Sequence, residues 1–178
     1  MEIYLIRHTA PDIAKGICYG QADVPLLKPI EHALNRVGEA FPPDIDVVYT
    51  SPLSRCMILA QHLAALRNIP IHTDVRLKEL NFGTWELKAW DDIDPTVLLP
   101  WMDNYDVMSC PEGESYSHLV ARVRSFIDDI KASGVDRVAV VTHAGVIRAS
   151  HVVLHNMALR DSMEVVVEYG GIYRERCQ

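Results

Sequence analysis

Four residues with cationic or imidazole side chains stand directly behind apolar stretches of this chain. Arg7 and His8 follow the apolar run of residues 3–6, His143 ends a Val-rich run, and Arg55 lies just after a third apolar stretch. A guanidinium offers a rigid fork of N–H groups that matches phosphate oxygens. A neutral imidazole can act as a nucleophile. These residue types indicate a phosphate site beside a reactive imidazole.

One acid completes the candidate set. Glu79, in the string LKELNFGTWE, could donate a proton to a leaving oxygen and later accept one from water. Taken singly, each of the five residues has an ordinary alternative as a surface turn, a solvated helix residue or a surface acid. Together they describe a cationic pocket with one carboxyl group, which suits a phosphate dianion.

Short apolar runs predict the strands that position these side chains. The run RVAVVTH is almost entirely Val and Ala where it is apolar, which favours a central parallel strand. The last two runs, SMEVVVEY and GGIYRER, favour a pair of closing strands at an edge. The predicted strands are residues 3–6, 46–50, 69–75, 137–143, 162–169 and 170–176.

Apolar residues at helical spacing predict a helix in each connection. Pro29 suits the first turn of the first helix. Ser51 is the predicted N-cap of the second helix, and Gly134 is the predicted C-cap of the third. The predicted helices are residues 30–41, 52–66, 115–133 and 144–157.

The alternation of strands and helices predicts an α/β fold, a three-layer sandwich with a mostly parallel central sheet, in one domain over residues 1–178. Residues 85–114 have no clear period and contain all three tryptophans, so we expect an irregular or short-helical insertion that covers the site. Ligands bind such sheets beyond the carboxyl ends of the strands. That rule brings together the residues behind the first, second and fourth strands.

Composition limits the partners and the compartment. The 178 residues carry 24 acidic and 17 basic side chains, a net charge of −7, which argues against nucleic acid but not against a small anion. No apolar run is long enough to span a membrane, and we expect no signal peptide before the first strand. The four cysteines lack C-x-x-C spacing, so we expect no metal site among them and reduced thiols in the cytoplasm.

Six motifs, in order through nearly the whole chain, resemble those of the histidine phosphatase superfamily, which is also called phosphoglycerate mutase-like. They are LIRHTAP, GICYGQADVPL, VYTSPLSRC, LKELNFGTWE, PEGESY and VVTHAGVIR. The RHT-P start together with CYGQADVPL looks most like the α-ribazole phosphatase branch, which acts late in cobalamin nucleotide-loop assembly. The resemblance implies a phosphoglycerate mutase-like fold and a phosphomonoesterase.

The resemblance also implies a role for each residue of the candidate set. His8 would attack phosphorus and form a phosphohistidine, with its other ring nitrogen donating to a backbone carbonyl. Arg7, Arg55 and His143 would bind the phosphoryl oxygens and stabilise their charge. Glu79 would protonate the leaving oxygen and then activate water. No metal or other cofactor is needed for this chemistry.

Substrate contacts are expected from a second group of residues. The loop that the family uses to contact substrate contains Tyr19, Gly20 and Gln21, and the backbone N–H of Ala144 could add a phosphate contact. The expected partner is a small phosphorylated metabolite, with α-ribazole 5'-phosphate as the first candidate and no nucleic acid or membrane partner. Exposed Tyr and Val near the C-terminus could pair edge strands in a homodimer.

Three other functions stay open. A phosphoglycerate mutase is less favoured, because the chain ends soon after its last strand and so would lack a tail that shields the phosphohistidine. A broad-specificity sugar or nucleotide phosphatase is a second alternative. A non-catalytic phospho-ligand module is disfavoured because Glu79 would repel a bound phosphate unless it were protonated.

Overall fold

A five-stranded sheet in the order β3-β2-β4-β1-β5 forms the centre of the computed structural model, which describes residues 1–177. Strand β1 pairs in parallel with β4, and β2 pairs in parallel with both β4 and β3, whereas the edge strand β5 is antiparallel to β1. The prediction of a mostly parallel sheet is confirmed. The strands are β1 (Glu2–Arg7), β2 (Val47–Thr50), β3 (Ile71–Thr73), β4 (Arg137–Thr142) and β5 (Ile172–Arg176).

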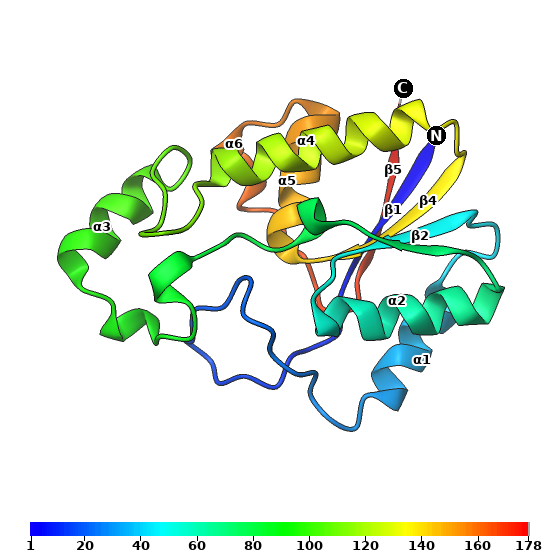
Figure 1. Cartoon of the computed structure of the whole chain (residues 1–178), viewed down its shortest axis with the longest axis horizontal. Coiled ribbons are helices and arrows are strands. Elements are labelled where there is room, and N and C mark those ends of the chain that lie inside the picture. The colour runs from blue at the N-terminus through cyan, green and yellow to red at the C-terminus, as the bar shows by residue number, and fades with distance from the viewer. Residues whose placement is uncertain (178) are drawn as a thin grey trace.

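Helices cover both faces of this sheet (Figure 1). Helices α1 and α2 lie on one face and α4 and α5 on the other, while α3 lies apart from the strands at the far end of the molecule. Within residues 1–177, no helix combines the length and apolarity that crossing a membrane requires. The helices are α1 (Glu31–Ala40), α2 (Ser54–Arg67), α3 (Pro95–Asn104), α4 (Tyr116–Ala132), α5 (Ala144–His155) and α6 (Leu159–Ser162).

The central strands are buried on both faces, and their side chains alternate between two cores. Along β1, Ile3 and Leu5 pack with the residues of α4 and α5, whereas Tyr4 and Ile6 pack with those of α1 and α2. A strand with two covered faces reads as a continuous apolar run. This explains why β1 and β4 are easy to recognise in the sequence, and it confirms the three-layer sandwich.

Helix α4 lies within the predicted range of residues 115–133 and is one residue shorter at each end. Ser115 is its N-cap and forms a capping box with His118, whose backbone N–H donates to the serine hydroxyl at 3.4 Å. The helix ends at Ala132 with Ser133 as its C-cap, so the predicted C-cap at Gly134 is one residue too late. Gly134 follows the cap with a φ of +76°, a left-handed conformation that glycine adopts without strain.

The predicted N-cap of α2 is wrong. The helix begins at Ser54 with Leu53 in the cap position, and Leu53 has no side-chain cap bond to offer. The carboxylate of Asp23 accepts the backbone N–H of Ser54 at 2.9 Å instead. The hydroxyl of Ser51 pairs with a buried histidine of the site described below, so its polar character reflects that contact rather than a helix start.

The predicted strand over residues 162–169 is also wrong, because β5 is the only closing strand within residues 1–177. Carbonyl groups of this segment are taken by side chains instead of a sheet partner. Arg148 donates to the carbonyl of Val165 at 3.1 Å, and Arg7 donates to that of Val167. The apolar alternation of the segment reflects burial of Val167 against the core without strand pairing.

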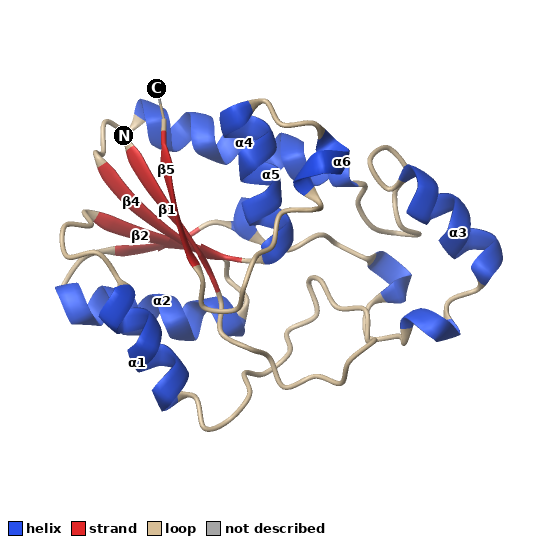
Figure 2. Ribbon diagram, turned by 180° about the vertical axis from the view of Figure 1, so that it is seen from behind, coloured by secondary structure: helices blue, strands red, loops and turns tan. Residues whose placement is uncertain are grey.

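The tryptophan-rich stretch forms short helices, as expected. It contains two 3-10 turns, Gly83–Trp85 and Trp90–Asp92, followed by α3. The ring of Trp101 packs edge to face on Trp85 at 5.3 Å between centroids and stacks on Trp90. These rings build a small core of their own beside the two main ones, in the part of the molecule that carries α3 (Figure 2).

Candidate active site

The register of β1 and β4 brings two histidines together at the carboxyl ends of the strands. Arg7 pairs with Thr142, the last residues of the two strands, so the next residues, His8 and His143, leave the sheet side by side. Their ring centroids lie 5.2 Å apart, and both side chains are buried. The prediction that the segments after these strands converge is confirmed.

The ring of His8 is held in one tautomer. Its Nδ1 lies 2.7 Å from the carbonyl oxygen of Thr9, which can only accept, so Nδ1 carries the hydrogen and Nε2 keeps its lone pair. The pKa of His8 is lowered to about 3, chiefly by burial and also by the charges of Arg55 and Arg7, against the opposing effect of the hydrogen bond to Thr9. The imidazole is therefore neutral at physiological pH.

His143 is neutral for the same reasons. Burial lowers its pKa well below the ordinary value, with smaller contributions from His8 and Arg55. Its Nε2 lies 2.9 Å from the hydroxyl of Ser51 and 3.5 Å from the sulfur of Cys56. The hydroxyl of Ser51 fixes the orientation of this ring.

Two arginines supply the positive charge. The fully buried Arg55 donates to the carbonyls of Ala22, at 2.8 Å, and Gly20, at 2.5 Å, and so ties the loop after β1 to helix α2. The guanidinium of Arg7 stacks on the ring of Tyr169, 3.6 Å from its centroid. The Nε–H of each arginine is buried without a protein partner, as expected of donors set aside for an anion.

Glu79 is held by backbone donors. Its carboxylate accepts the N–H of Leu80 at 2.9 Å and that of Gly145, in the first turn of α5, at 3.0 Å. A Cβ atom on Gly145 would lie 2.1 Å from Oε1 of Glu79, so only glycine allows this approach. Arg122, which is ion-paired with Glu114 at 2.9 Å, donates to the backbone carbonyl of Glu79.

All five residues of the predicted catalytic set line one cavity of about 230 Å³, and Tyr19 lines it too. Its other polar walls come from Arg148 and Tyr116. Three arginines face one carboxylate there, so the cavity suits an anion better than a cation. The remaining lining is largely apolar and aromatic and consists of Ile17, Leu80, Phe82, Trp90, Leu119, Met163 and the backbone at Gly145.

Three residues predicted to contact substrate do not line this cavity. The carbonyl of Gly20 accepts from Arg55, and the side-chain amide of Gln21 donates to the carbonyl of Glu79 at 3.1 Å. Ala144 is the first residue of α5, and it is Gly145 that lines the cavity. In the structure Gly20 and Gln21 brace the catalytic residues, and substrate contact by these three residues stays a prediction.

Residues that the sequence reasoning missed hold the site together. The carboxylate of Glu86 accepts the N–H groups of Gly20, Gln21 and Ala22 at 2.9–3.0 Å, and it lies in the GTWE motif, which was a usable signal. Tyr169 donates to or accepts from Tyr19 at 2.8 Å between hydroxyls. Nothing in the sequence alone connects residues 150 positions apart, so this pair needed the structure.

Comparison with known proteins places the chain in a family. The pattern that defines the histidine phosphatase superfamily (branch 1) matches residues 3–177, and the chain belongs to this superfamily. The relatives of this chain include phosphatases, in agreement with the geometry of the cavity.

Three similar proteins illustrate the range of substrates. A Hydrogenobacter thermophilus protein with the provisional name phosphoserine phosphatase 2 is 29% identical over 96% of this chain and 87% of its own length. The adenosylcobalamin/α-ribazole phosphatase of Escherichia coli K12 is 29% identical over 83% of this chain and 75% of its own. A crystal structure provisionally assigned as an E. coli α-ribazole-5'-P phosphatase matches with a TM-score of 0.89 and 25% identity. The match covers 98% of this chain and 89% of that one.

Proposed function

We propose that this protein is a phosphomonoesterase that works through a phosphohistidine on His8. The observation that carries the proposal is the state of that ring. Its Nδ1–H is committed to the carbonyl of Thr9, while the ring lines a cavity walled by Arg7 and Arg55. The free Nε2 lone pair is therefore the nucleophile that meets a bound phosphoryl group.

In the first half of the reaction, Nε2 of His8 forms a bond to phosphorus as the ester P–O bond breaks. Arg7, Arg55 and the neutral His143 hold the phosphoryl oxygens and stabilise the charge that builds on them. The carboxyl group of Glu79 gives its proton to the leaving oxygen, so the product leaves as an alcohol.

In the second half, water attacks phosphorus and the P–N bond to His8 breaks. The carboxylate of Glu79, already fixed by two backbone N–H groups, takes one proton from this water. Inorganic phosphate leaves, His8 is again neutral, and Glu79 is protonated for the next turnover. Every proton in the cycle moves between substrate, water and Glu79.

We propose α-ribazole 5'-phosphate as the substrate. Part of the cavity wall is formed by apolar and aromatic side chains, Phe82 and Trp90 among them. Such a wall suits a leaving group that ends in an apolar aromatic base. The similarity to α-ribazole phosphatases, in both sequence and structure, supports this choice.

L-phosphoserine is the second candidate. The relative named as a phosphoserine phosphatase has the same identity as the E. coli α-ribazole phosphatase and matches more of this chain. Recognition of an amino acid needs an anionic partner for the ammonium group as well as a cation for the carboxylate. Arg148 could bind the carboxylate, but Glu79 is the sole acid among the lining residues and is already engaged as described above. The cavity therefore favours the aromatic substrate.

The two candidates are separated by a turnover screen. We expect kcat/KM for α-ribazole 5'-phosphate to exceed that for L-phosphoserine by at least about 100-fold, with sugar phosphates and nucleotides in between. A preference for L-phosphoserine would reverse the substrate assignment. Formation of 2-phosphoglycerate from 3-phosphoglycerate, measured in the same screen, would instead identify a mutase.

The cellular setting is part of the proposal. All four cysteines are free thiols in the structure, and three of them are buried. A reducing compartment keeps thiols in this state, so we propose that the enzyme acts in the cytoplasm, in cobalamin nucleotide-loop assembly. A homodimer through the exposed sheet edges stays a prediction, tested by the mass of the protein in solution.

A further inference from the structure

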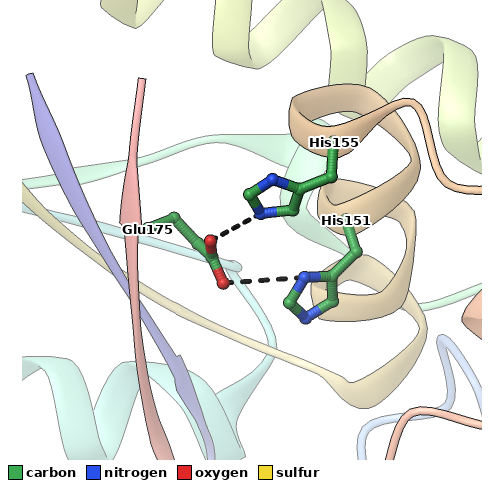
Figure 3. Close-up of side chains that lie close together, drawn as sticks. All are labelled: His151, His155 and Glu175. Atoms are coloured by element: carbon green, nitrogen blue, oxygen red, sulfur yellow. Dashed lines mark hydrogen bonds and ion pairs between the residues drawn. The ribbon is translucent and has the colours of Figure 1, made fainter. Parts of the chain in front are cut away.

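Two histidines and a glutamate that take no part in the proposed reaction meet near the C-terminal end of helix α5 (Figure 3). His151 and His155 lie one helical turn apart on α5, and Glu175 reaches them from the edge strand β5. One ligand atom from each of the three lies within 4.8 Å of the other two. They come from two elements that are far apart in the sequence.

The carboxylate of Glu175 faces a nitrogen of each ring (Figure 3). Its Oε2 is 2.7 Å from Nε2 of His155, and its Oε1 is 3.5 Å from Nδ1 of His151. The two imidazoles are nearly parallel, with centroids 5.8 Å apart, so their nitrogens point to the same side of the helix. This is a convergent set of two nitrogen ligands and one oxygen ligand.

No permanent cation accounts for this carboxylate. The side chain of Glu175 is only 12% exposed, and no lysine or arginine of residues 1–177 forms an ion pair with it. A half-buried carboxylate usually has a charged partner. The Nε2 of His151 is also buried without a hydrogen-bond partner, so no other protein group competes for this ring.

We propose that His151, His155 and Glu175 bind one divalent transition-metal ion, with Zn²⁺ as the best fit. Imidazole nitrogens and a carboxylate oxygen are ligands that zinc takes at about 2.0–2.2 Å, which puts tetrahedral ligand atoms ~3.4 Å apart. Small side-chain rotations reach this spacing from the observed one. His155 is 44% exposed, which leaves water access for the fourth position.

The position of the site points to a structural role. Glu175 pairs across the sheet with Ile3 in β1, while His151 and His155 lie in the last half of α5, away from the end that contributes Gly145 to the active site. A metal ion here would join the antiparallel edge strand to the helix that covers it. It would stabilise the fold without touching the phosphoryl chemistry.

The test is thermal unfolding of the chelator-stripped protein with and without ZnCl₂. At a free zinc concentration about 100 times Kd, Tm should rise by about 5 °C, because the ion binds only the folded cluster. Titration calorimetry should give one zinc per chain, and Co²⁺ should show the visible absorption of a tetrahedral site. Absence of any zinc-dependent change in Tm would overturn the proposal.

Variants locate the ion. Glu175→Gln and His155→Asn should abolish the zinc-dependent rise in Tm, and their unfolding curves without zinc show whether they are folded. His8→Ala, in the active site, and His32→Ala, on the surface of α1, should keep the full response. A response that survives in both cluster variants, or that disappears in His8→Ala, would place the zinc elsewhere.

Discussion

The reactivity proposed for His8 follows from its neighbours and not from its residue type. The carbonyl of Thr9 chooses its tautomer, and burial beside two arginines keeps it neutral. His143 has the same protonation state but donates to or accepts from Ser51. Two neighbouring histidines thus acquire different roles, because only the ring of His8 keeps Nε2 free of protein partners.

The role of Glu79 as the general acid is tested by replacing it with glutamine. Glu79→Gln removes the proton donor, so hydrolysis of alkyl phosphates should fall by about 10²–10⁴-fold. Hydrolysis of p-nitrophenyl phosphate, whose leaving group needs no proton, should fall far less. Steady-state kinetics on both substrates is the measurement. Glu39→Gln, on the exposed surface of α1, is the matched control. Equal losses on the two substrates would argue against a general acid here.

The buried histidines also make stability depend on pH. The pKa of His8 is about 3 in the folded chain and near 6.5 when unfolded, so only the unfolded chain binds a proton as the pH falls below about 6.5. The contribution of His8 to stability is thus largest above this pH and declines toward pH 3. Between pH 7 and pH 5, the free energy of unfolding measured in urea should fall by about 2 kcal/mol less in His8→Asn than in the wild type. Identical losses would mean that His8 is protonated in the folded state.

Among the elements, the first turn of α5 has the most direct effect on the site. It begins immediately after His143, and its Gly145 lies against the carboxylate of Glu79. Glycine is normally unfavourable within a helix. Its presence here is explained by the space that the carboxylate needs.

Gly145→Ala should therefore displace Glu79 and lower activity on alkyl phosphates by about 10-fold or more, although alanine is the better helix former. Gly38→Ala is the matched control, because it lies in α1 and its new methyl group would meet side chains alone, the flexible end of Leu66 at 2.7 Å and the ring of His62 at 3.2 Å. Activity is measured by phosphate release. Unchanged activity in Gly145→Ala would show that the position of Glu79 is not critical.

The elements also show where sequence reasoning succeeds. β1, β4 and α4 were predictable, because their apolar patterns are local properties. The segment over residues 162–169 was not, since its strand-like alternation is satisfied by hydrogen bonds from Arg7 and Arg148, which lie far away in the sequence. The N-cap of α2 was missed for a related reason, because a distant carboxylate replaces the local serine.

At the scale of the whole molecule, the sheet rule predicted the site better than any single motif. It placed residues from three strand ends in one cavity, and all five catalytic candidates lie there. The bracing residues were harder to find. Arg122 and Tyr169 act through contacts with Glu79, Arg7 and Tyr19 that only the tertiary structure creates.

Activity and metal content should be separable in the whole protein. The proposed reaction uses arginines where other phosphatases use a divalent ion, so EDTA should leave kcat on p-nitrophenyl phosphate within about twofold of the untreated value. The same treatment should remove the Tm gain that zinc confers. A parallel loss of activity that zinc restores would contradict the metal-free mechanism.

The central claim is the covalent intermediate, and it is tested by trapping it. The enzyme is mixed with an activated aryl phosphate, quenched in alkali during the first turnover and analysed by mass spectrometry, with His8→Ala as the control. We predict a gain of one phosphoryl group that is stable in alkali, is lost in acid and maps to His8. Rapid product formation with no phosphorylated enzyme, or phosphorylation of another residue, would contradict the account.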